Sequence, residues 1–288
     1  MDTKNEEIMV SVICMCYNHE KYIKDALESF VNQKTSFKYE VFVHDDASTD
    51  KSADIIREYE KKYPEIIKPI YQTENQHSQG VKAVKTHILP KISGKYLAFC
   101  EGDDYWTDEN KLQKQVDFLE SHPEFDVCVH NTEVEYMASN KIEIRLPMED
   151  NEIKLLDILK ENNRYHTSSL LVRKEFYINK PFWVYMIPGI GDLPSSIYYT
   201  ASGRVMCFGD VMSHYRCGVA GSWTERQEKS FKKQITDNKN IVKMLKAANR
   251  YYEYKYSKTF KKFILKYEFH VIKGYIKLIF PFLSSIKR

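Results

Sequence analysis

Apolar runs typical of buried strands alternate with amphipathic segments along the first half of the chain. Residues 10–17 form a continuous apolar run, and 39–44 and 96–100 predict two further strands, as in a parallel sheet buried on both faces. Residues 66–72 predict a weaker strand, which Pro69 confines to an edge. Helical stripes of apolar residues lie between the strands, at 23–31, 53–59 and 81–89. This alternation predicts an α/β fold with a mostly parallel, Rossmann-like sheet and helices on both faces.

The second half is less regular. Its pattern predicts helices over 111–121 and 193–201 and strands over 126–136, 168–173 and 204–208. From about residue 226 onward the sequence becomes helical and polar. We therefore expect one α/β domain over residues 1–225 and a helical, basic C-terminal extension over 226–288.

The composition is that of a globular chain. Of its 288 residues, 43% are hydrophobic and 29% are charged, which allows a substantial core. No uncharged apolar run is long enough to cross a bilayer. The six cysteines lack the paired spacing of a zinc site, and several lie in predicted buried strands. Because no secretory signal precedes them, we expect a reduced, cytoplasmic protein.

Charge is distributed unevenly. The formal net charge is +3, but residues 258–288 alone carry eight Lys or Arg and one acid, so the rest of the chain is mildly acidic. Apolar residues recur at helical spacing between these lysines, at Phe260, Phe263, Ile264, Tyr267, Val271, Tyr275 and Ile279. A basic amphipathic helix can lie on an anionic membrane surface. The alternative is that its apolar face packs against the rest of the protein.

Three polar motifs lie at the carboxyl ends of predicted strands. They are Met15-Cys16-Tyr17-Asn18, His44-Asp45-Asp46-Ala47-Ser48 and Glu101-Gly102-Asp103-Asp104. In open α/β sheets, ligands bind in the crevice at the carboxyl ends of the strands. Three motifs at such ends predict one ligand site more strongly than any single motif does.

The acidic motif indicates a metal. Glu101, Asp103 and Asp104 would repel one another unless a cation or solvent screened their charges. Mg²⁺ and Mn²⁺ prefer oxygen ligands and can bridge a diphosphate, and Gly102 allows a close backbone approach. The alternative is a solvated acidic loop, which the position directly after a buried strand disfavours.

Asp45 and Asp46 follow the second strand. A residue among 48–50 can cap the next helix, as Asn18 can after the first strand. Capping does not require the two preceding carboxylates. We therefore expect at least one of Asp45 and Asp46 to accept a hydrogen bond from a nucleotide base or a ribose hydroxyl.

In this order, the three motifs, with Tyr105 and Trp106 after the last, resemble those of the family 2 glycosyltransferases with the GT-A fold. The resemblance covers about residues 9–225, with a nucleotide-sugar-binding half at about 9–110 and an acceptor half at 111–225. It implies transfer of a sugar, with inversion, from a UDP-sugar to a hydroxyl of a glycan or lipid-linked acceptor. The implied setting is the synthesis of a bacterial envelope polysaccharide.

The resemblance also implies residue roles. Asp46 would bond the base, usually uracil, and Asp103 would be the ligand of Mn²⁺ or Mg²⁺. Glu101, where the family normally has Asp, matches the other acid of the metal-binding motif. The nucleotide-binding set would comprise Met15, Cys16, Tyr17, Asp45, Asp46, Glu101, Gly102, Asp103 and Arg216.

The expected general base is Asp192, which lies in a glycine-flanked turn before a predicted helix. The family pattern there is Glu-Asp, and this chain has Gly191 instead of the Glu. The alternative is that Asp192 only caps the helix. Arg216, in a late Tyr-Arg segment, would pair with a phosphate oxygen or, alternatively, form a surface salt bridge.

Other function classes share parts of this pattern. A sugar-nucleotide-binding protein without catalysis, or a regulatory subunit, would keep the sheet, but the acids at 103 and 192 argue against it. A nucleotidyltransferase would normally have a glycine-rich basic loop where this chain has Asn18-His19-Glu20. No GxGxxG follows residues 10–17, which disfavours a dinucleotide oxidoreductase. We expect no nucleic-acid partner, and we expect peripheral contact with the inner face of the cell membrane through residues 258–288.

Overall fold

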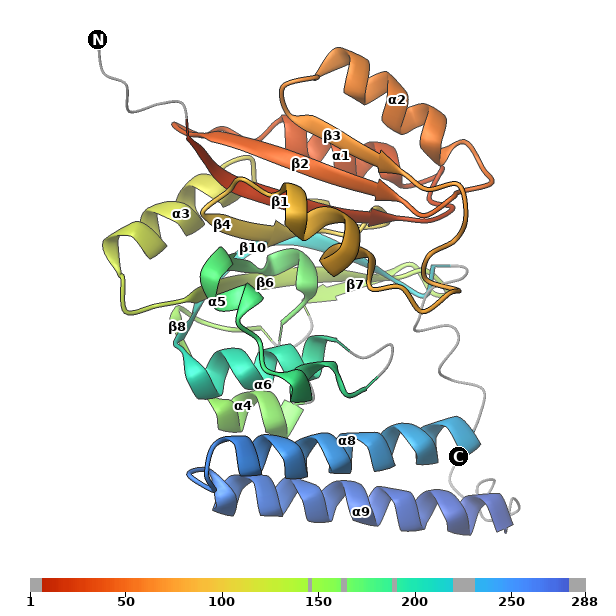
Figure 1. Ribbon diagram of the computed structural model, residues 1–288, viewed down its shortest axis with the longest axis vertical. Helices are drawn as coiled ribbons and strands as arrows, with labels where there is room; N and C mark the ends of the chain where they lie inside the picture. The colour runs from red at the N-terminus through yellow and green to blue at the C-terminus, as the bar shows by residue number, and fades with distance from the viewer. Residues whose placement is uncertain (1–6, 145–146, 162–164, 188–190, 220–230, 280–288) are drawn as a thin grey trace. The chain divides into compact units, whose positions relative to one another are not determined.

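The computed structural model describes residues 7–144, 147–161, 165–187, 191–219 and 231–279. The chain forms two compact units. The first unit comprises residues 1–153, 164–179 and 202–217, and the second comprises 154–163, 180–201 and 218–288. Figure 1 shows the chain and labels most of its helices and strands.

A parallel block of four strands forms one half of the sheet in the first unit (Figure 1). Strands β1 (Ile8–Cys16), β2 (Lys38–Asp45), β3 (Ile67–Tyr71) and β4 (Tyr96–Phe99) lie in the order β3-β2-β1-β4. All three neighbouring pairs are parallel. The predicted strands of the first half are confirmed, and β3, which contains Pro69, lies at an edge of the sheet in the described residues.

The other half of the sheet is mixed. The antiparallel strand β9 (Leu171–Arg173) joins β4 to β6 (Val127–Tyr136), which pairs in parallel with β10 (Val205–Cys217). Three short antiparallel strands complete the sheet: β5 (Tyr105–Trp106), β7 (Lys141–Ile144) and β8 (Asn151–Ile153). Two predicted bounds are wrong here. Residues 167–169 form a 3-10 turn, η3, rather than strand, and β10 continues past residue 208 through two register shifts.

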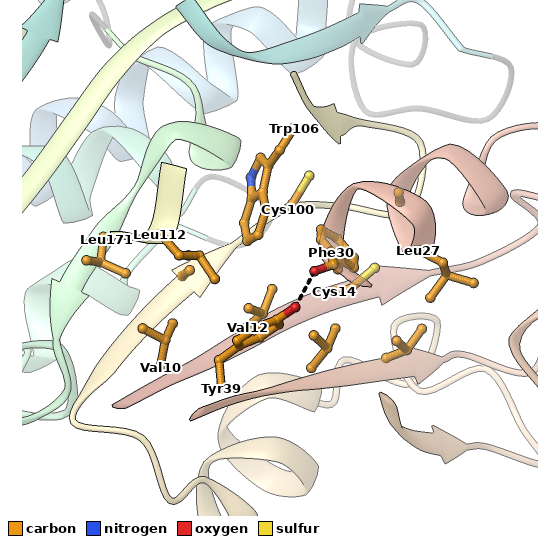
Figure 2. Close-up of a cluster of buried hydrophobic side chains, with 14 of the residues drawn as sticks. Val10, Val12, Cys14, Leu27, Phe30, Tyr39, Cys100, Trp106, Leu112 and Leu171 are labelled. Carbon is orange, nitrogen blue, oxygen red and sulfur yellow. Dashed lines mark hydrogen bonds between the residues drawn. The ribbon is translucent and has the colours of Figure 1, made fainter. Parts of the chain in front are cut away.

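Three helices cover one face of the sheet: α1 (Ile23–Val31), α2 (Ser52–Lys62) and α3 (Lys111–Ser121). Their apolar side chains pack on alternate residues of the strands, such as Val12 of β1 and Tyr39 of β2 (Figure 2). The Tyr39 hydroxyl donates to the Phe30 carbonyl at 2.8 Å, which ties β2 to α1. Because successive side chains of a strand point to opposite faces, the residues of β1 between these positions, such as Ile13, lie on the other face of the sheet, where they are also buried.

The segments on the opposite face are shorter. They are η1 (Val84–Ile88), η2 (Leu89–Lys91) and α5 (Lys174–Ile178), whose Tyr177 ring contacts Phe99 of β4. The helix predicted over 81–89 is confirmed as a helical segment, but it begins at Val84 and is a π-helix that continues into a 3-10 helix. Pro90 lies in the first turn of η2, and its missing N–H removes a helical hydrogen bond at this point.

The second unit is helical in its described part. It contains α4 (Leu155–Glu161), η4 (Phe182–Tyr185), α6 (Asp192–Ser202), α8 (Phe231–Tyr251) and α9 (Ser257–Ile279). Helices α8 and α9 form an antiparallel hairpin, in which Lys246 pairs with Glu268 at 2.8 Å. Four apolar residues of the predicted tail stripe are buried in α9: Phe260, Phe263, Ile264 and Tyr267. Among the described residues, no helix combines the length and apolar character needed to cross a membrane.

Candidate active site

The acidic loop is anchored at the carboxyl end of β4. The Gly102 N–H donates to the Met15 carbonyl at 2.9 Å, so the loop continues the pairing between β4 and β1. A Cβ atom at Gly102 would lie 2.9 Å from Ile23 Cδ1 and 3.0 Å from His19 Nδ1. A larger residue at 102 would therefore have to displace the Ile23 and His19 side chains, which glycine avoids.

One carboxylate oxygen of Asp103 has no hydrogen-bond partner in the part of the chain that the structure describes. Its Oδ1 is buried and accepts no hydrogen bond, whereas Oδ2 lies 3.9 Å from Nε2 of His19. Burial lowers the pKa of His19 despite the nearby Asp103 charge. A buried carboxylate oxygen is costly to leave unpaired, so Asp103 is suited to bind a cation or a donor from a ligand.

Asp104 lies deeper than its neighbours in the loop. It is buried, and its Oδ1 accepts from the backbone N–H of Arg216 at 3.0 Å. Burial, with the charges of Asp103 and Glu101, raises the pKa of Asp104 well above its usual value. Glu101, in contrast, is exposed. The loop thus contains an exposed acid, Glu101, an acid with one partnerless oxygen, Asp103, and a buried supporting acid, Asp104.

Arg216 holds the acidic loop from β10. Its guanidinium donates to the Asp103 carbonyl at 3.0 Å and to the Asp25 carboxylate of α1. The same group lies over the rings of Tyr22 and Tyr105, at 5.1 and 4.8 Å from their centroids. Arg216 is therefore part of a clamp on the acidic loop, and one of its contacts is a salt bridge to the half-exposed Asp25. To bind a phosphate, it would have to give up part of this clamp.

Asp45 and Asp46 differ in their contacts at the end of β2. Both carboxylates are buried. The Asp46 oxygens accept from the backbone N–H groups of Gln76 and His77 at 2.7 and 3.1 Å. Among the described residues, the Asp45 carboxylate accepts only from Ser48 N–H, at 3.2 Å through Oδ2, and its Oδ1 has no partner. Asp46 thus holds the loop after β3, and Asp45 keeps acceptor capacity for a ligand.

The loop after β1 is tied to the loop after β2. Asn18, in a left-handed backbone conformation (φ 57°), accepts from Thr49 N–H at 2.8 Å. His19 N–H donates to the Ser52 hydroxyl at 2.8 Å. Asn18 does not cap a helix as predicted, because α1 begins only at Ile23 and its capping position is Tyr22.

The predicted nucleotide-pocket residues 15–17 end β1. Cys16 is buried, and burial next to Asp45 raises the pKa of its thiol to about 12. Burial also raises the pKa of Cys14, so neither thiol is suited to act as a thiolate nucleophile or metal ligand. Tyr17, in contrast, is 45% exposed, so its ring is available to stack on a planar ligand.

A charged cluster beside the loop was not predicted. His214 lies between two carboxylates, with ring nitrogens 3.0 Å from Glu133 and 3.0 Å from Glu135, and its ring stacks on Tyr105 at 4.8 Å. The sequence signal was the long alternating run of β6, whose residues 133 and 135 share a face. This cluster adjoins the contacts of Arg216, because the Glu135 carboxylate also lies 4.0 Å from Arg216 Nε.

Asp192 belongs to the second unit. It is the first residue of α6, where an acid interacts favourably with the helix dipole. Lys180 lies in the same unit, and burial lowers its pKa to about 7 although the Asp192 charge opposes the shift. Residues 188–190, before the predicted base, lie outside the described residues, as do residues 221–223 near the late Tyr-Arg segment.

The fit to a divalent cation rests on the acidic loop. Within the described part of the chain, no group of three His, Cys, Asp or Glu side chains is arranged to hold a metal by itself. Mg²⁺ and Mn²⁺ are commonly held by one or two carboxylates together with substrate phosphates. The partnerless Asp103 Oδ1 and the exposed Glu101 fit such a shared site.

The sequence of this chain matches a known protein family. The model of glycosyl transferase family 2 matches residues 11–179. An uncharacterised protein of Mycobacterium tuberculosis is 34% identical over 223 residues, which are 74% of this chain and 60% of that protein. The putative teichuronic acid biosynthesis glycosyltransferase TuaG of Bacillus subtilis is 36% identical over 115 residues, 40% of this chain and 43% of that protein. This chain thus spans about 60% of the length of its mycobacterial relatives.

Solved structures share the fold. S. aureus TarS (residues 1–349) in complex with UDP-GlcNAc superimposes with a TM-score of 0.63 at 20% identity, covering 83% of this chain and 66% of that one. A mannosyltransferase of Pyrobaculum calidifontis in complex with GDP-Man and Mn²⁺ gives a TM-score of 0.58 at 15% identity, with 98% and 76% coverage. These likenesses confirm the expected GT-A architecture. Since the family model matches more than half of its residues, the chain belongs to glycosyl transferase family 2.

Proposed function

We propose that this protein transfers a sugar from a UDP-sugar to a hydroxyl group of a glycan or lipid-linked acceptor, in the synthesis of a bacterial envelope polysaccharide. The observation that carries the proposal is Asp103, a buried acid with a partnerless oxygen in a loop held by Met15 and Arg216. Its position at the carboxyl end of a parallel strand suits a ligand. The relative TuaG, described as acting in teichuronic acid biosynthesis, supports the proposed setting.

The nucleotide would bind across the ends of β1, β2 and β4. Asp45 is the better candidate for the base or ribose, since its Oδ1 has no partner while both oxygens of Asp46 accept backbone N–H groups. Asp46 would then act by positioning the loop at 76–77. The exposed Tyr17 ring would stack on the base. Uracil is the proposed base because the family resemblance implies it.

A divalent cation, Mn²⁺ or Mg²⁺, would be held by Asp103, with Glu101 as the second acid, and would share the diphosphate oxygens. When bound, it would neutralise negative charge on the leaving nucleotide. Arg216 keeps Asp103 and Asp104 in place through its contacts with both residues. These contacts hold the loop in one position, and a rigid binding loop reduces the cost of binding.

Asp192 would be the general base. It would take the proton of the acceptor hydroxyl as that oxygen bonds to the anomeric carbon. The bond from this carbon to the diphosphate breaks, and UDP leaves with its electron pair. Because attack and departure occur on opposite faces of the sugar, the configuration inverts. Asp192 lies in the second unit, so its role is separable by mutation from nucleotide binding in the first.

The acceptor would be reached at the inner face of the cell membrane, which the protein would contact peripherally through residues 258–288. This stretch is strongly basic in sequence, and basic amphipathic helices bind anionic lipid surfaces.

A panel of nucleotide sugars tests the proposal. Thermal unfolding would be followed with UDP-, GDP- and ADP-sugars, each with and without Mn²⁺. A rise in the melting temperature with UDP-sugars that requires Mn²⁺ is the expected result. No shift with any nucleotide sugar contradicts the proposal. Binding without release of UDP in the presence of many acceptors would instead indicate a sugar-nucleotide-binding protein.

A further inference from the structure

Helix α9 carries an exposed apolar stripe. It consists of Leu265, Phe269, Ile272, Ile276 and Ile279, which are between 46% and 66% exposed. Their spacing of four, three, four and three residues keeps them on one face of the helix. We call these five residues the α9 stripe. Large apolar side chains that line up in this way normally mark a contact surface.

The α9 stripe is distinct from the face that packs in the hairpin. At 100° per residue, Phe263 and Tyr267, which are buried, lie roughly 160° around the helix from Leu265. Gly274 is on that buried face, where a Cβ atom would lie 2.6 Å from Cγ1 of Ile235 in α8. Packing on α8 therefore accounts for one apolar face of α9 and leaves the α9 stripe exposed.

Lysines border the α9 stripe. Lys266 and Lys273 are exposed and lie roughly 90° from its centre, on one flank. Lys258, Lys261 and Lys262 are exposed in the first turns of α9. The one acid of this helix, Glu268, is on the other flank and is paired with Lys246. The free charge around the stripe is thus positive.

We infer that α9 lies on an anionic lipid surface, with the α9 stripe in the boundary between headgroups and acyl chains and its lysines on the lipid phosphates. An apolar stripe with a basic border has the chemistry of an interfacial helix. Two copies of α9 packed through the stripe would bring their lysine borders together, which like-charge repulsion disfavours. The α9 stripe specifies which part of the chain would make the membrane contact of the proposed function. The identity of the lipid surface rests on that proposed function.

Sedimentation with lipid vesicles tests the inference on the full chain. The vesicles contain phosphatidylcholine and phosphatidylglycerol in a two-to-one ratio, and pure phosphatidylcholine vesicles serve as the comparison. The apolar variant is Phe269→Ser with Ile272→Ser, and its matched control is Ile142→Ser with Ile144→Ser, since these β7 residues are also exposed. The charge variant is Lys266→Gln with Lys273→Gln, matched by Lys51→Gln with Lys61→Gln, which are exposed in the first unit.

The wild type should bind the anionic vesicles at least about tenfold more tightly than the neutral ones. Both α9 variants should lose about tenfold or more of this affinity, whereas both controls keep it. Circular dichroism and UDP binding should be unchanged in all four, which separates this inference from the sugar transfer. Equal binding to both vesicle types, or unchanged binding by the α9 variants, would overturn it. A dimer in light scattering that the Ser variants dissociate, without vesicle binding, would identify a second copy as the partner instead.

Discussion

The backbone N–H of Arg216 donates to the Asp104 carboxylate at 3.0 Å, which joins the end of β10 to the loop after β4. These residues are far apart in sequence, and the bond is reinforced by the Arg216 side chain on the Asp103 carbonyl. Because the clamp uses backbone as well as side-chain groups, it fixes the position of the acidic loop. The proposed metal ligand, Asp103, is therefore held in place by contacts of Arg216 with both residues of the loop.

Replacing Arg216 with Ala should destabilise the protein and weaken nucleotide binding together. The variant loses charge-assisted hydrogen bonds to Asp25 and Asp103, so the free energy of unfolding should fall by about 2 kcal/mol. Urea unfolding and UDP titration measure the two effects. Arg57→Ala removes an exposed pair with Asp54 and should cost about 1 kcal/mol or less. Equal effects of the two substitutions would contradict the clamp.

Asp45→Asn should mainly weaken UDP binding, whereas Asp46→Asn should mainly lower the stability of the protein. Asp45→Asn should lower UDP affinity about tenfold or more, with little change in stability, because the partnerless Oδ1 is the proposed ligand contact. Asp46→Asn loses an acceptor for the N–H groups of Gln76 and His77, so it should lower the unfolding free energy by about 1–2 kcal/mol. Urea unfolding and calorimetric titration distinguish them. A larger affinity loss in Asp46→Asn would assign the base contact to Asp46.

Asp192→Asn should abolish transfer without affecting nucleotide binding. Removal of a general base typically costs about 10²–10⁴-fold in turnover, while the proposed UDP-binding residues lie in the other unit. Asn keeps the hydrogen-bonding capacity of a helix cap, so folding should be retained. Asp157→Asn, in the first turn of α4 in the same unit, is the matched control and should keep its turnover. Full turnover by Asp192→Asn would remove Asp192 from the mechanism.

Lys111 should make stability depend on pH. It is fully buried, with Nζ 4.3 Å from the centre of the Trp106 ring and 2.7 Å from Gln115 Oε1, and burial lowers its pKa to about 7. Between that value and the ordinary lysine pKa of about 10.4, the unfolded chain binds more protons than the folded one. The free energy of unfolding should therefore rise with pH in this window.

Lys111→Met should reduce that rise, and Lys180, whose pKa burial also lowers to about 7, should account for what remains. In urea unfolding, the free energy of unfolding of the variant should exceed that of the wild type, and by more at about pH 7 than at about pH 9. Lys114→Met is the control on the same helix, since the Asp108 and Asp210 carboxylates raise the pKa of Lys114 and leave it charged at both values. A wild-type stability that stays level between the two pH values would show that Lys111 is not neutral in the folded state.

The strands and helices of the parallel half could be predicted because burial on both faces leaves a clear pattern. The residues that form α3 match the predicted range, and β1, β2 and β4 differ from theirs by one or two residues at their ends. The pattern failed where local hydrogen bonding, rather than burial, decides the backbone. Asn18 bonds to the loop at Thr49 instead of capping α1, and residues 84–91 form π and 3-10 turns around Pro90.

The site could be predicted only as far as residue type and strand ends allow. The sequence places Asp45 and Asp46 side by side with nothing to distinguish them, and only the contacts of Gln76 and His77 do so. The contact between Arg216 and Asp104 depends on the pairing of β10 with β5 and β6, which has no local signal. On α9, helical spacing alone does not reveal which apolar face packs against α8 and which stays exposed.

The central claim is that Asp103 couples a divalent cation to nucleotide binding, and calorimetric titration of UDP with and without Mn²⁺ tests it most directly. For the wild type and for Asp117→Asn, a control in the exposed part of α3, Mn²⁺ should raise the affinity for UDP about tenfold or more. In Asp103→Asn, Mn²⁺ should have no effect, although the metal-free affinity stays near that of the wild type. An Mn²⁺-dependent gain of the same size in Asp103→Asn would contradict the account.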